Sequence, residues 1–306
     1  MAPLPEAEPP LSRRRNRPST PDRGAAAPEG DATGSDEDRS ADEAEAEPST
    51  DTEHDAHDGH DEHDEHARPE RPKPIAAEEV PAGAALVASK IGKDYGDGMG
   101  LVALDLEVQP GELVMLVGPN GAGKSTFLGL AAGLVEPSNG AAWVAGAPVG
   151  SIRARAATSY LPDAPVLYDD LSLDEHIEYI ARMHHTVEWE DYADDLLEMF
   201  QLTERAPDLP SRFSRGLKQK TSLILGLIRP FSLLLIDEPF VGLDTPGQEA
   251  LVEVLADVAE QGATVICSTH QMDLTPKATR CVGLRDGELS YDGPASPEKI
   301  RSLVGG

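Results

Sequence analysis

Short apolar runs recur from about residue 84 onward, and they predict the strands of a folded domain. Residues 103–108 (ALDLEV) alternate apolar and acidic side chains, as a strand with one buried face does. Residues 112–117 (ELVMLV), 232–237 (SLLLID) and 263–268 (ATVICS) are almost continuously apolar. Such runs are typical of parallel strands that are covered on both faces of a sheet.

Helical patterns lie between these predicted strands. Ser172 and Glu175 have the spacing of a capping box and predict a helix start. Thr245 and Gln248 predict a second box, before a helix with one apolar face that ends at Gly262. Strands that alternate with helices predict an α/β domain.

Two further features complete the expected organisation of this domain. The stretch CVGLRDGELSYDG predicts a hairpin that turns at Asp286-Gly287. The sequence pattern from about residue 163 to residue 230 is mainly helical, and we expect this stretch to form a helical subdomain.

The charge of the chain divides it into two parts. The 306 residues carry a net charge of -29, and residues 1–80 contain 23 acidic and 9 basic side chains together with 11 prolines. A segment with so few large apolar residues buries too little surface to offset the entropy of ordering it. The composition predicts a disordered acidic tail over residues 1–82 and a folded domain over residues 83–306.

A histidine run stands out in this tail. Five histidines recur at every third position among carboxylates, which places them on one edge of an extended chain with three residues per turn. Imidazoles of this kind bind zinc, nickel or copper loosely. Metal binding and a solvated low-complexity run with no ligand both stay open for these residues: His54, His57, His60, His63 and His66.

Composition excludes several classes of protein. The acidic charge disfavours a partner rich in nucleic-acid phosphate. Two cysteines, Cys267 and Cys281, are too few for a disulfide framework. No apolar run approaches the roughly 18 residues of a membrane span, and no apolar stretch follows the early arginine cluster as in a signal peptide.

A phosphate-binding motif follows the apolar strand at residues 112–117. GPNGAGKST has the spacing GxxxxGK[ST], and it precedes an apolar helical pattern. Backbone N–H groups of such a loop surround phosphates at a helix N-terminus, while Lys124 pairs with the phosphates and Ser125 with Mg²⁺. The expected nucleotide-binding residues are Gly118, Pro119, Asn120, Gly121, Ala122, Gly123, Lys124, Ser125 and Thr126.

Two adjacent carboxylates end the apolar strand at residues 232–237. Asp237, at the carboxyl end of the strand, is the candidate that holds Mg²⁺ through water. Glu238 is the candidate that polarises the attacking water as a general base.

With these motifs in this order, residues 85–306 resemble the ATP-binding-cassette (ABC) ATPases. FSRGLKQK at residues 213–220 is similar to the family's LSGGQ signature, VGLD at residues 241–244 to its D-loop, and His270 to its switch histidine. Tyr95 stands where the family stacks an aromatic ring on adenine. The resemblance implies a P-loop NTPase core with a mixed sheet, an antiparallel β part at its N-terminal side and an inserted helical subdomain.

The resemblance also implies ATP and Mg²⁺ as cofactors and a head-to-tail pair of cassettes, as a homodimer or a heterodimer. ATP would lie between the P-loop of one subunit and the signature of the other, where helix N-terminal amides near Leu217 face the γ-phosphate. Glu238 would act as base and His270 would hold the γ-phosphate. The implied signature and D-loop residues are Ser214, Arg215, Gly216, Leu217 and Asp244.

The chain departs from the family pattern at two places. Arg215 and Leu217 replace a glycine and the glutamine of LSGGQ, as in exporter-type members. Asp163 stands in place of the Q-loop glutamine, and a carboxylate has a shorter reach and a charge that the amide lacks.

The predicted function is that of an ATPase subunit which powers a separate membrane permease, for export, from the cytoplasmic face of the membrane. By family analogy, the permease would dock around residues 163–185. The alternative is a soluble ABC ATPase that acts on ribosomes or DNA, which the acidic charge and the single cassette disfavour.

Overall fold

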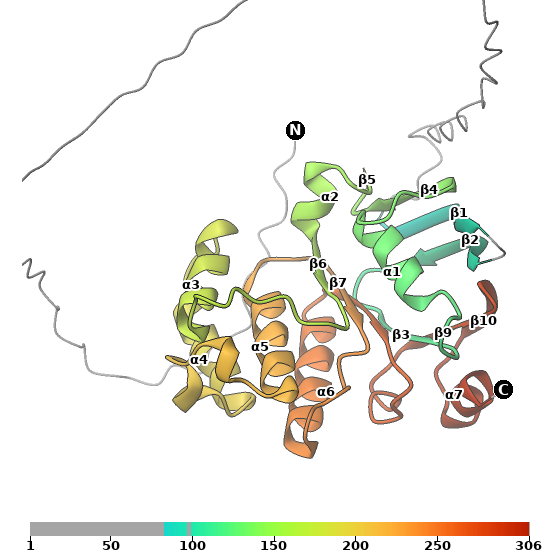
Figure 1. Cartoon of the computed structure of the whole chain (residues 1–306). Coiled ribbons are helices and arrows are strands. Elements are labelled where there is room, and N and C mark those ends of the chain that lie inside the picture. The colour runs from blue at the N-terminus through green and yellow to red at the C-terminus, as the bar shows by residue number, and fades with distance from the viewer. Residues whose placement is uncertain (1–82, 97–98, 306) are drawn as a thin grey trace, which may run out of the picture. The chain divides into compact units, whose positions relative to one another are not determined.

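The computed structural model of the chain describes residues 83–96 and 99–305. The predicted acidic tail and its five histidines lie outside these residues. Two sheets are present in the described part (Figure 1). The larger has the strand order β10 (Glu288–Gly293), β9 (Arg280–Arg285), β3 (Leu113–Val117), β8 (Thr264–Ser268), β7 (Leu233–Asp237) and β6 (Thr158–Leu161).

The larger sheet is mixed and the smaller is antiparallel. In the larger sheet β9, β3, β8, β7 and β6 are parallel, and only β10 runs against its neighbour. The smaller sheet contains β2 (Met99–Val108), β1 (Leu86–Gly96), β4 (Asn139–Val144) and β5 (Ala147–Pro148). The predicted α/β fold with an antiparallel N-terminal part is confirmed.

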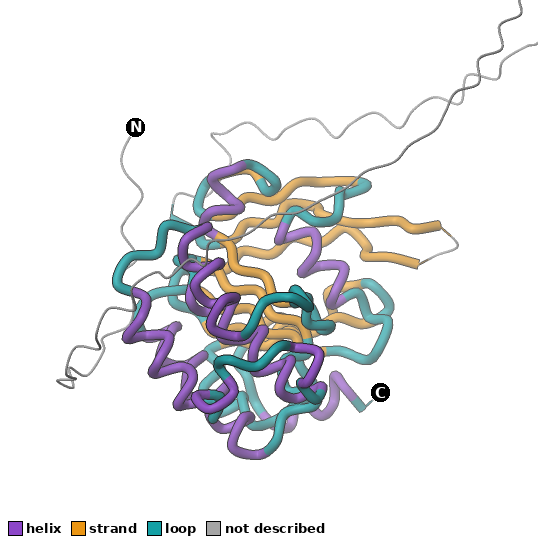
Figure 2. The backbone as a smooth tube through the Cα atoms, turned by 60° about the vertical axis from the view of Figure 1, so that its left-hand side comes forward, coloured by secondary structure: helices purple, strands orange, loops and turns teal. Residues whose placement is uncertain are grey.

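The helices cover the larger sheet on both faces (Figures 1 and 2). The helix α1 packs between the two sheets, with contacts to β7, β1 and β4. The opposite face is covered by α5 and α6, and α3 and α4 pack against α5. The helices are α1 (Lys124–Ala132), α2 (Ile152–Ala157), α3 (Leu173–Met183), α4 (Trp189–Met199), α5 (Arg215–Ile228), α6 (Thr245–Glu260) and α7 (Pro297–Val304), with short 3-10 turns η2 (Thr203–Arg205) and η3 (Pro210–Arg212).

The central strand β3 shows why its sequence is apolar throughout. Leu113, Met115 and Val117 face the core that contains α5 and α6, while Val114 and Leu116 face the core that contains α1. Successive side chains of a strand point to opposite faces, and both faces here are covered. The strand therefore holds the segment that follows it, residues 118–123, in a fixed position at its carboxyl end.

The helix starts confirm one predicted cap, correct a second, and place one predicted helix start two residues earlier. Ser172 and Glu175 form the capping box of α3. The cap of α6 is Asp244, whose side chain accepts from the Gly247 N–H at 3.2 Å, so the box predicted for Thr245 and Gln248 is wrong. Asp244 has the extended backbone that a cap needs, whereas Thr245 is already helical. The helix α5 begins at Arg215, before the predicted start near Leu217.

Replacement of Leu116 tests how far the buried sheet stabilises the domain. Leu116→Ala is expected to lower the free energy of unfolding by about 2–5 kcal/mol, because it opens a cavity between β3 and α1. Urea unfolding followed by circular dichroism measures the change. Val102→Ala, on the exposed side of β2, is the matched control and should change this free energy by less than about 1 kcal/mol. Equal losses in the two variants would contradict the assignment.

Candidate functional site

The phosphate-binding motif forms the turn between β3 and α1. Gly123 has φ +99°, a conformation that favours glycine, and a Cβ there would lie 2.9 Å from Leu101 Cδ1. Ala122 N–H donates to the Pro119 carbonyl at 3.1 Å and closes the loop. No side chain caps α1, so its N-terminal amides remain available to an anion.

Lys124 connects this loop to the carboxylate that follows β7. Its side chain is buried, and Nζ donates to the carbonyls of Gly118 at 3.0 Å and Pro119 at 3.5 Å. The same Nζ lies 3.5 Å from Glu238 Oε1. A buried ammonium requires such partners, because an unpaired charge is costly to bury. The amine is therefore held where the loop, β7 and α1 meet.

Ser268, at the end of β8, organises the two acidic residues. Its hydroxyl donates to Asp237 Oδ1 at 2.5 Å, and both its carbonyl and Oγ accept from the Glu238 N–H, at 2.9 and 3.2 Å. Glu238 has φ +46°, which is uncommon for a residue with a side chain. These hydrogen bonds stabilise the backbone conformation of Glu238. The Asp237 carboxylate then contacts Ser268, whereas the Glu238 carboxylate contacts Lys124 and His270.

His270 contacts the second oxygen of Glu238. Nδ1 lies 3.1 Å from Glu238 Oε2, and about half of the imidazole surface is exposed. A carboxylate only accepts, so Nδ1 carries the proton and Nε2 is left for another partner. Lys124, Glu238 and His270 thus form a continuous chain of polar contacts that comes from three separate elements.

The negative charge at these strand ends contributes to raised pKa values at two neighbouring groups, Cys267 and Tyr160. Burial raises the pKa of the Cys267 thiol well above its usual value, and the charges of Glu238 and Asp237 add to the rise. Burial also raises the pKa of Tyr160, with Asp237 and Asp163 contributing. Asp163 follows β6 at the carboxyl end of the sheet, next to the end of β7, and it is exposed.

The hairpin that carries Tyr95 lies against the phosphate loop. Lys93 pairs with Leu101 across the β1–β2 ladder. The Leu101 side chain occupies the position next to Gly123 where a Cβ would lie. The Tyr95 ring is 54% exposed, with Lys93 Nζ 5.5 Å from its centre. An exposed aromatic face beside a phosphate loop is suited to stacking on a base.

The signature segment lies at the start of α5. Ser214 is the helix cap, and its Oγ accepts from the Leu217 N–H at 3.2 Å. Arg215 is exposed, and Gly216 and Leu217 are half-buried. Among the described residues, no hydrogen bond or ion pair joins this segment to residues 118–126. The structure thus groups the phosphate loop with Glu238 and His270 through direct contacts, and with Asp237 through Ser268.

Two contributors to the site were not predicted. The sequence marks Ser268 only as the last residue of a buried strand, and nothing in its local pattern indicates the Asp237 and Glu238 contacts. The signature resemblance assigns no role to Lys220. It pairs with Asp244, and no local signal indicates this pair, because the residues around Lys220 in α5 are also polar.

The donor set near Asp237 fits a magnesium ion. The Asp237 carboxylate is buried at the end of β7, and Ser125 lies in the first turn of α1, which contacts β7; both offer the oxygen ligands that Mg²⁺ prefers. Described residues include no cluster of three or more metal-ligating side chains. One or two protein ligands are what this ion takes when phosphate oxygens and water complete its shell.

Comparisons with known proteins agree with this geometry. The model of the family described as ABC transporter matches residues 101–241. The "SkfA peptide export ATP-binding protein SkfE" of Bacillus subtilis (strain 168) is 35% identical over 205 residues, which are 66% of this chain and 86% of that protein.

Solved structures show the same fold. An ATP-binding subunit of an ABC transporter has a TM-score of 0.64 and 32% identity, over 71% of this chain and 92% of that one. A dimeric structure of the ATP-binding cassette MJ0796, in a post-hydrolysis state bound to ADP and Pi, has a TM-score of 0.62 and 22% identity, over 69% and 99% of the two chains.

Proposed function

Because the chain belongs to the ABC transporter family and is an ATP-binding ATPase of that family, we propose that it powers a separate membrane permease that exports its substrate. The contacts among Lys124, Glu238 and His270 carry the ATPase part of this proposal. They bring together an amine, a carboxylate and an imidazole at the ends of β3, β7 and β8, and these groups would bind phosphate, act as base and hydrogen-bond the γ-phosphate.

The three side chains have distinct roles in hydrolysis. Lys124 and the amides of the loop bind the β- and γ-phosphates. Glu238 accepts a proton from the water that attacks the γ-phosphorus, and ADP leaves as the bond to its β-phosphate oxygen breaks. His270 fixes the position of Glu238 through Nδ1, and its Nε2, when protonated as well, would donate to a γ-phosphate oxygen.

Asp237 and Ser125 would hold Mg²⁺, and Asp237 is oriented by Ser268. The ion supplies charge that offsets the phosphate oxygens. Tyr95 would stack on the adenine from the β1–β2 hairpin.

A second cassette completes the site under this proposal. Ser214, Arg215, Gly216 and Leu217 would contact the nucleotide of the opposite subunit, with amides of the first turn of α5 directed at its γ-phosphate. Asp244 belongs to the adjoining loop. The MJ0796 cassette, of the same fold, is dimeric, which supports the pairing.

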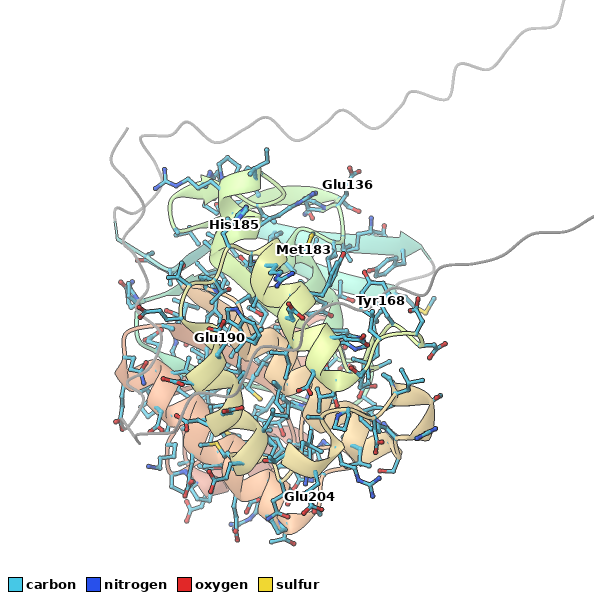
Figure 3. All side chains as sticks on the ribbon, turned by 90° about the vertical axis from the view of Figure 1, so that its left-hand side faces the viewer. Glu136, Tyr168, Met183, His185, Glu190 and Glu204 are labelled. Carbon is cyan, nitrogen blue, oxygen red and sulfur yellow. The ribbon has the colours of Figure 1, made fainter. Side chains whose placement is uncertain are left out.

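The permease would dock on the face formed by α3 and the loop before it. Val166, Tyr168, Tyr179 and Met183 are exposed there, and Figure 3 labels Tyr168 and Met183 on this face. A shallow hollow of about 410 Å³ beside them is lined by Tyr179, Met183 and charged neighbours. Apolar side chains gathered on one face favour a protein partner, and Asp163 leads into the same loop.

In the described residues no helix is long and apolar enough to cross a membrane. By analogy with relatives named as ATP-binding proteins of transporters, the proposal assigns the membrane-spanning part to a partner, with this chain at the cytoplasmic face of the membrane. Export as the direction is supported by the SkfE relative, whose name refers to peptide export.

Isolation of the full chain from gently solubilised native membranes in Mg-ATP tests the partner. A polytopic membrane protein is expected in stoichiometric amount. The double variant Tyr179→Glu with Met183→Glu should reduce the recovery of this membrane protein about 10-fold or more, because each carboxylate adds a charge to the apolar face.

Leu134→Glu, an exposed leucine after α1, is the matched control and should retain the membrane protein. Recovery of ribosomal or DNA-associated material, without a membrane protein, would contradict the proposal and favour the soluble alternative.

A further inference from the structure

The negative charge of the folded domain is concentrated in one stretch. Residues 163–200, which follow β6 and include α3 and α4, contain 12 acidic side chains and one basic side chain. The other residues from 81 to 306 contain 20 acidic and 16 basic side chains and are almost balanced. Charge that served solubility alone would be spread over the whole surface. The excess of carboxylates is therefore a property of the α3 and α4 region.

These carboxylates surround the exposed apolar side chains of α3. Eleven of the 12 acidic residues are exposed, and Glu178 is half-buried. Tyr179 and Met183 line the hollow of about 410 Å³ together with Glu175, Glu178 and Arg182. Arg182, the one basic side chain of the stretch, pairs with Glu178. An apolar surface is thus bordered by negative charge.

A second hollow, of about 240 Å³, lies between α3 and α4 and shares Glu178 with the first. Partial desolvation raises the pKa of Asp174 in this hollow, and the charges of neighbouring carboxylates add to the rise. A cation placed here would relieve that repulsion. The hollow is lined by apolar side chains that include Trp189 and by two carboxylates from each helix: Asp174, Glu178, Glu190 and Asp194. The two hollows and their carboxylates together form an acidic face, on which Figure 3 labels Met183 and Glu190.

A buried histidine holds the loop that borders the acidic face. His176 of α3 is 1% exposed, and its Nδ1 donates to the Ser172 carbonyl at 2.8 Å. The other ring nitrogen, Nε2, accepts from the Tyr168 N–H at 2.9 Å. Within the described part of the chain, no other hydrogen bond joins the backbone of residues 163–171 to the rest of the domain. The Tyr168 ring lies edge-on to Tyr179, with 5.7 Å between the ring centres, so this border is ordered before a partner binds.

Charge decides which occupant suits the acidic face. Nucleic acid and the anionic lipids of the cytoplasmic leaflet have the same sign of charge as these carboxylates, and so does a second copy of the face. Short cytoplasmic loops of membrane proteins have an excess of lysine and arginine. A basic loop of the permease is therefore the occupant whose charge matches.

We propose that the acidic face receives a basic amphipathic segment of the permease. Its apolar side chains would lie against Tyr179 and Met183, and its lysine or arginine side chains against the carboxylates of both hollows. This inference rests on the proposed function, which supplies the permease, and it adds the chemistry of the segment that docks. Opposite charges across an interface accelerate association and suppress partners of the wrong charge. The acidic face thus selects among permeases whose docking segments differ in charge.

Binding of a model peptide to the full chain tests this chemistry. The probe is a labelled helical peptide of leucine, alanine and lysine, about 18 residues long, with one apolar face and about six lysines. Its Kd, from fluorescence anisotropy, should rise about 5-fold or more in the double variant Glu175→Gln with Glu178→Gln at about 50 mM salt. The difference should fall below about 2-fold at about 500 mM salt, because exposed charges are then screened.

Matched controls assign the binding to this face. Glutamine at position 175 retains the acceptor that the capping box of α3 needs, so the helix start is kept. The double variant Glu249→Gln with Glu253→Gln removes two exposed charges from α6 and should leave the Kd within about 2-fold. A peptide of the same composition in shuffled order has no apolar face and should bind the parent about 5-fold or more weakly.

The permease itself separates this inference from the proposed function. In the isolation from native membranes at about 50 mM salt, the double variant Glu175→Gln with Glu178→Gln should recover about 5-fold less of the membrane protein than the parent. Absence of any membrane protein from the parent isolate would refute the function.

Other outcomes would overturn the inference alone. These are unchanged recovery in the double variant, equal peptide affinities of parent and double variant, and equal affinities of the ordered and shuffled peptides. Binding of phosphatidylglycerol vesicles by the parent, lost in the double variant, would also overturn it and assign the acidic face to lipid.

Discussion

Glu238→Gln is expected to lower kcat for ATP hydrolysis by about 10²–10⁴-fold, the range of a lost general base. The amide has the size of the carboxylate and can still accept from His270 Nδ1, but it takes no proton from water at neutral pH. Binding of ATP should persist, because the phosphate loop and Lys124 are unchanged. The variant should therefore accumulate bound ATP.

Single-turnover phosphate release and the Kd of a fluorescent ATP analogue measure these two effects. Glu249→Gln, on an exposed position of α6, is the matched control and should retain the parent rate. A Glu238→Gln chain with an unchanged kcat would remove Glu238 from the chemistry. A large rise in Kd would instead assign it to binding.

Lys124→Met should weaken ATP binding by about 100-fold or more, since truncation of one partner in a buried charge pair costs about 2–5 kcal/mol. The ammonium lies at the centre of the site, between two loop carbonyls and Glu238. In the variant the phosphates lose their charged partner, and Glu238 loses its neutralising neighbour. Hydrolysis at saturating ATP should fall as well.

Isothermal titration of the nucleotide measures the loss for Lys124→Met, and Lys277→Met is the control for a lysine outside the site. Thermal unfolding without nucleotide shows whether the fold is retained. Equal affinities of parent and Lys124→Met would contradict the role of the loop.

Local signals account for the parts of this protein that were predicted correctly. The capping box at Ser172 and the turn at Asp286-Gly287 depend on residues within a few positions of one another, and both are present, with positive φ at Asp286 and Gly287. The apolar runs gave the parallel strands because a strand covered on both faces excludes polar residues. The phosphate loop is equally local, between β3 and α1.

Contacts between segments far apart in the sequence could not be predicted from these local patterns. The cap of α6 is Asp244 and not Thr245, and Asp244 is the residue that Lys220 of α5 holds in place. A capping pattern contains no information about a lysine that arrives from another helix.

The sequence by itself determined the α/β class, the order of the strands along the chain and the identity of the charged groups at their ends, because these depend on periodicity and short-range chemistry. Only the tertiary structure decided that Ser268 bridges Asp237 and Glu238, that Lys124 meets Glu238, and that Lys220 pairs with Asp244. These pairs join strands and helices far apart in sequence, and they form only when the parallel sheet aligns its carboxyl ends at one edge.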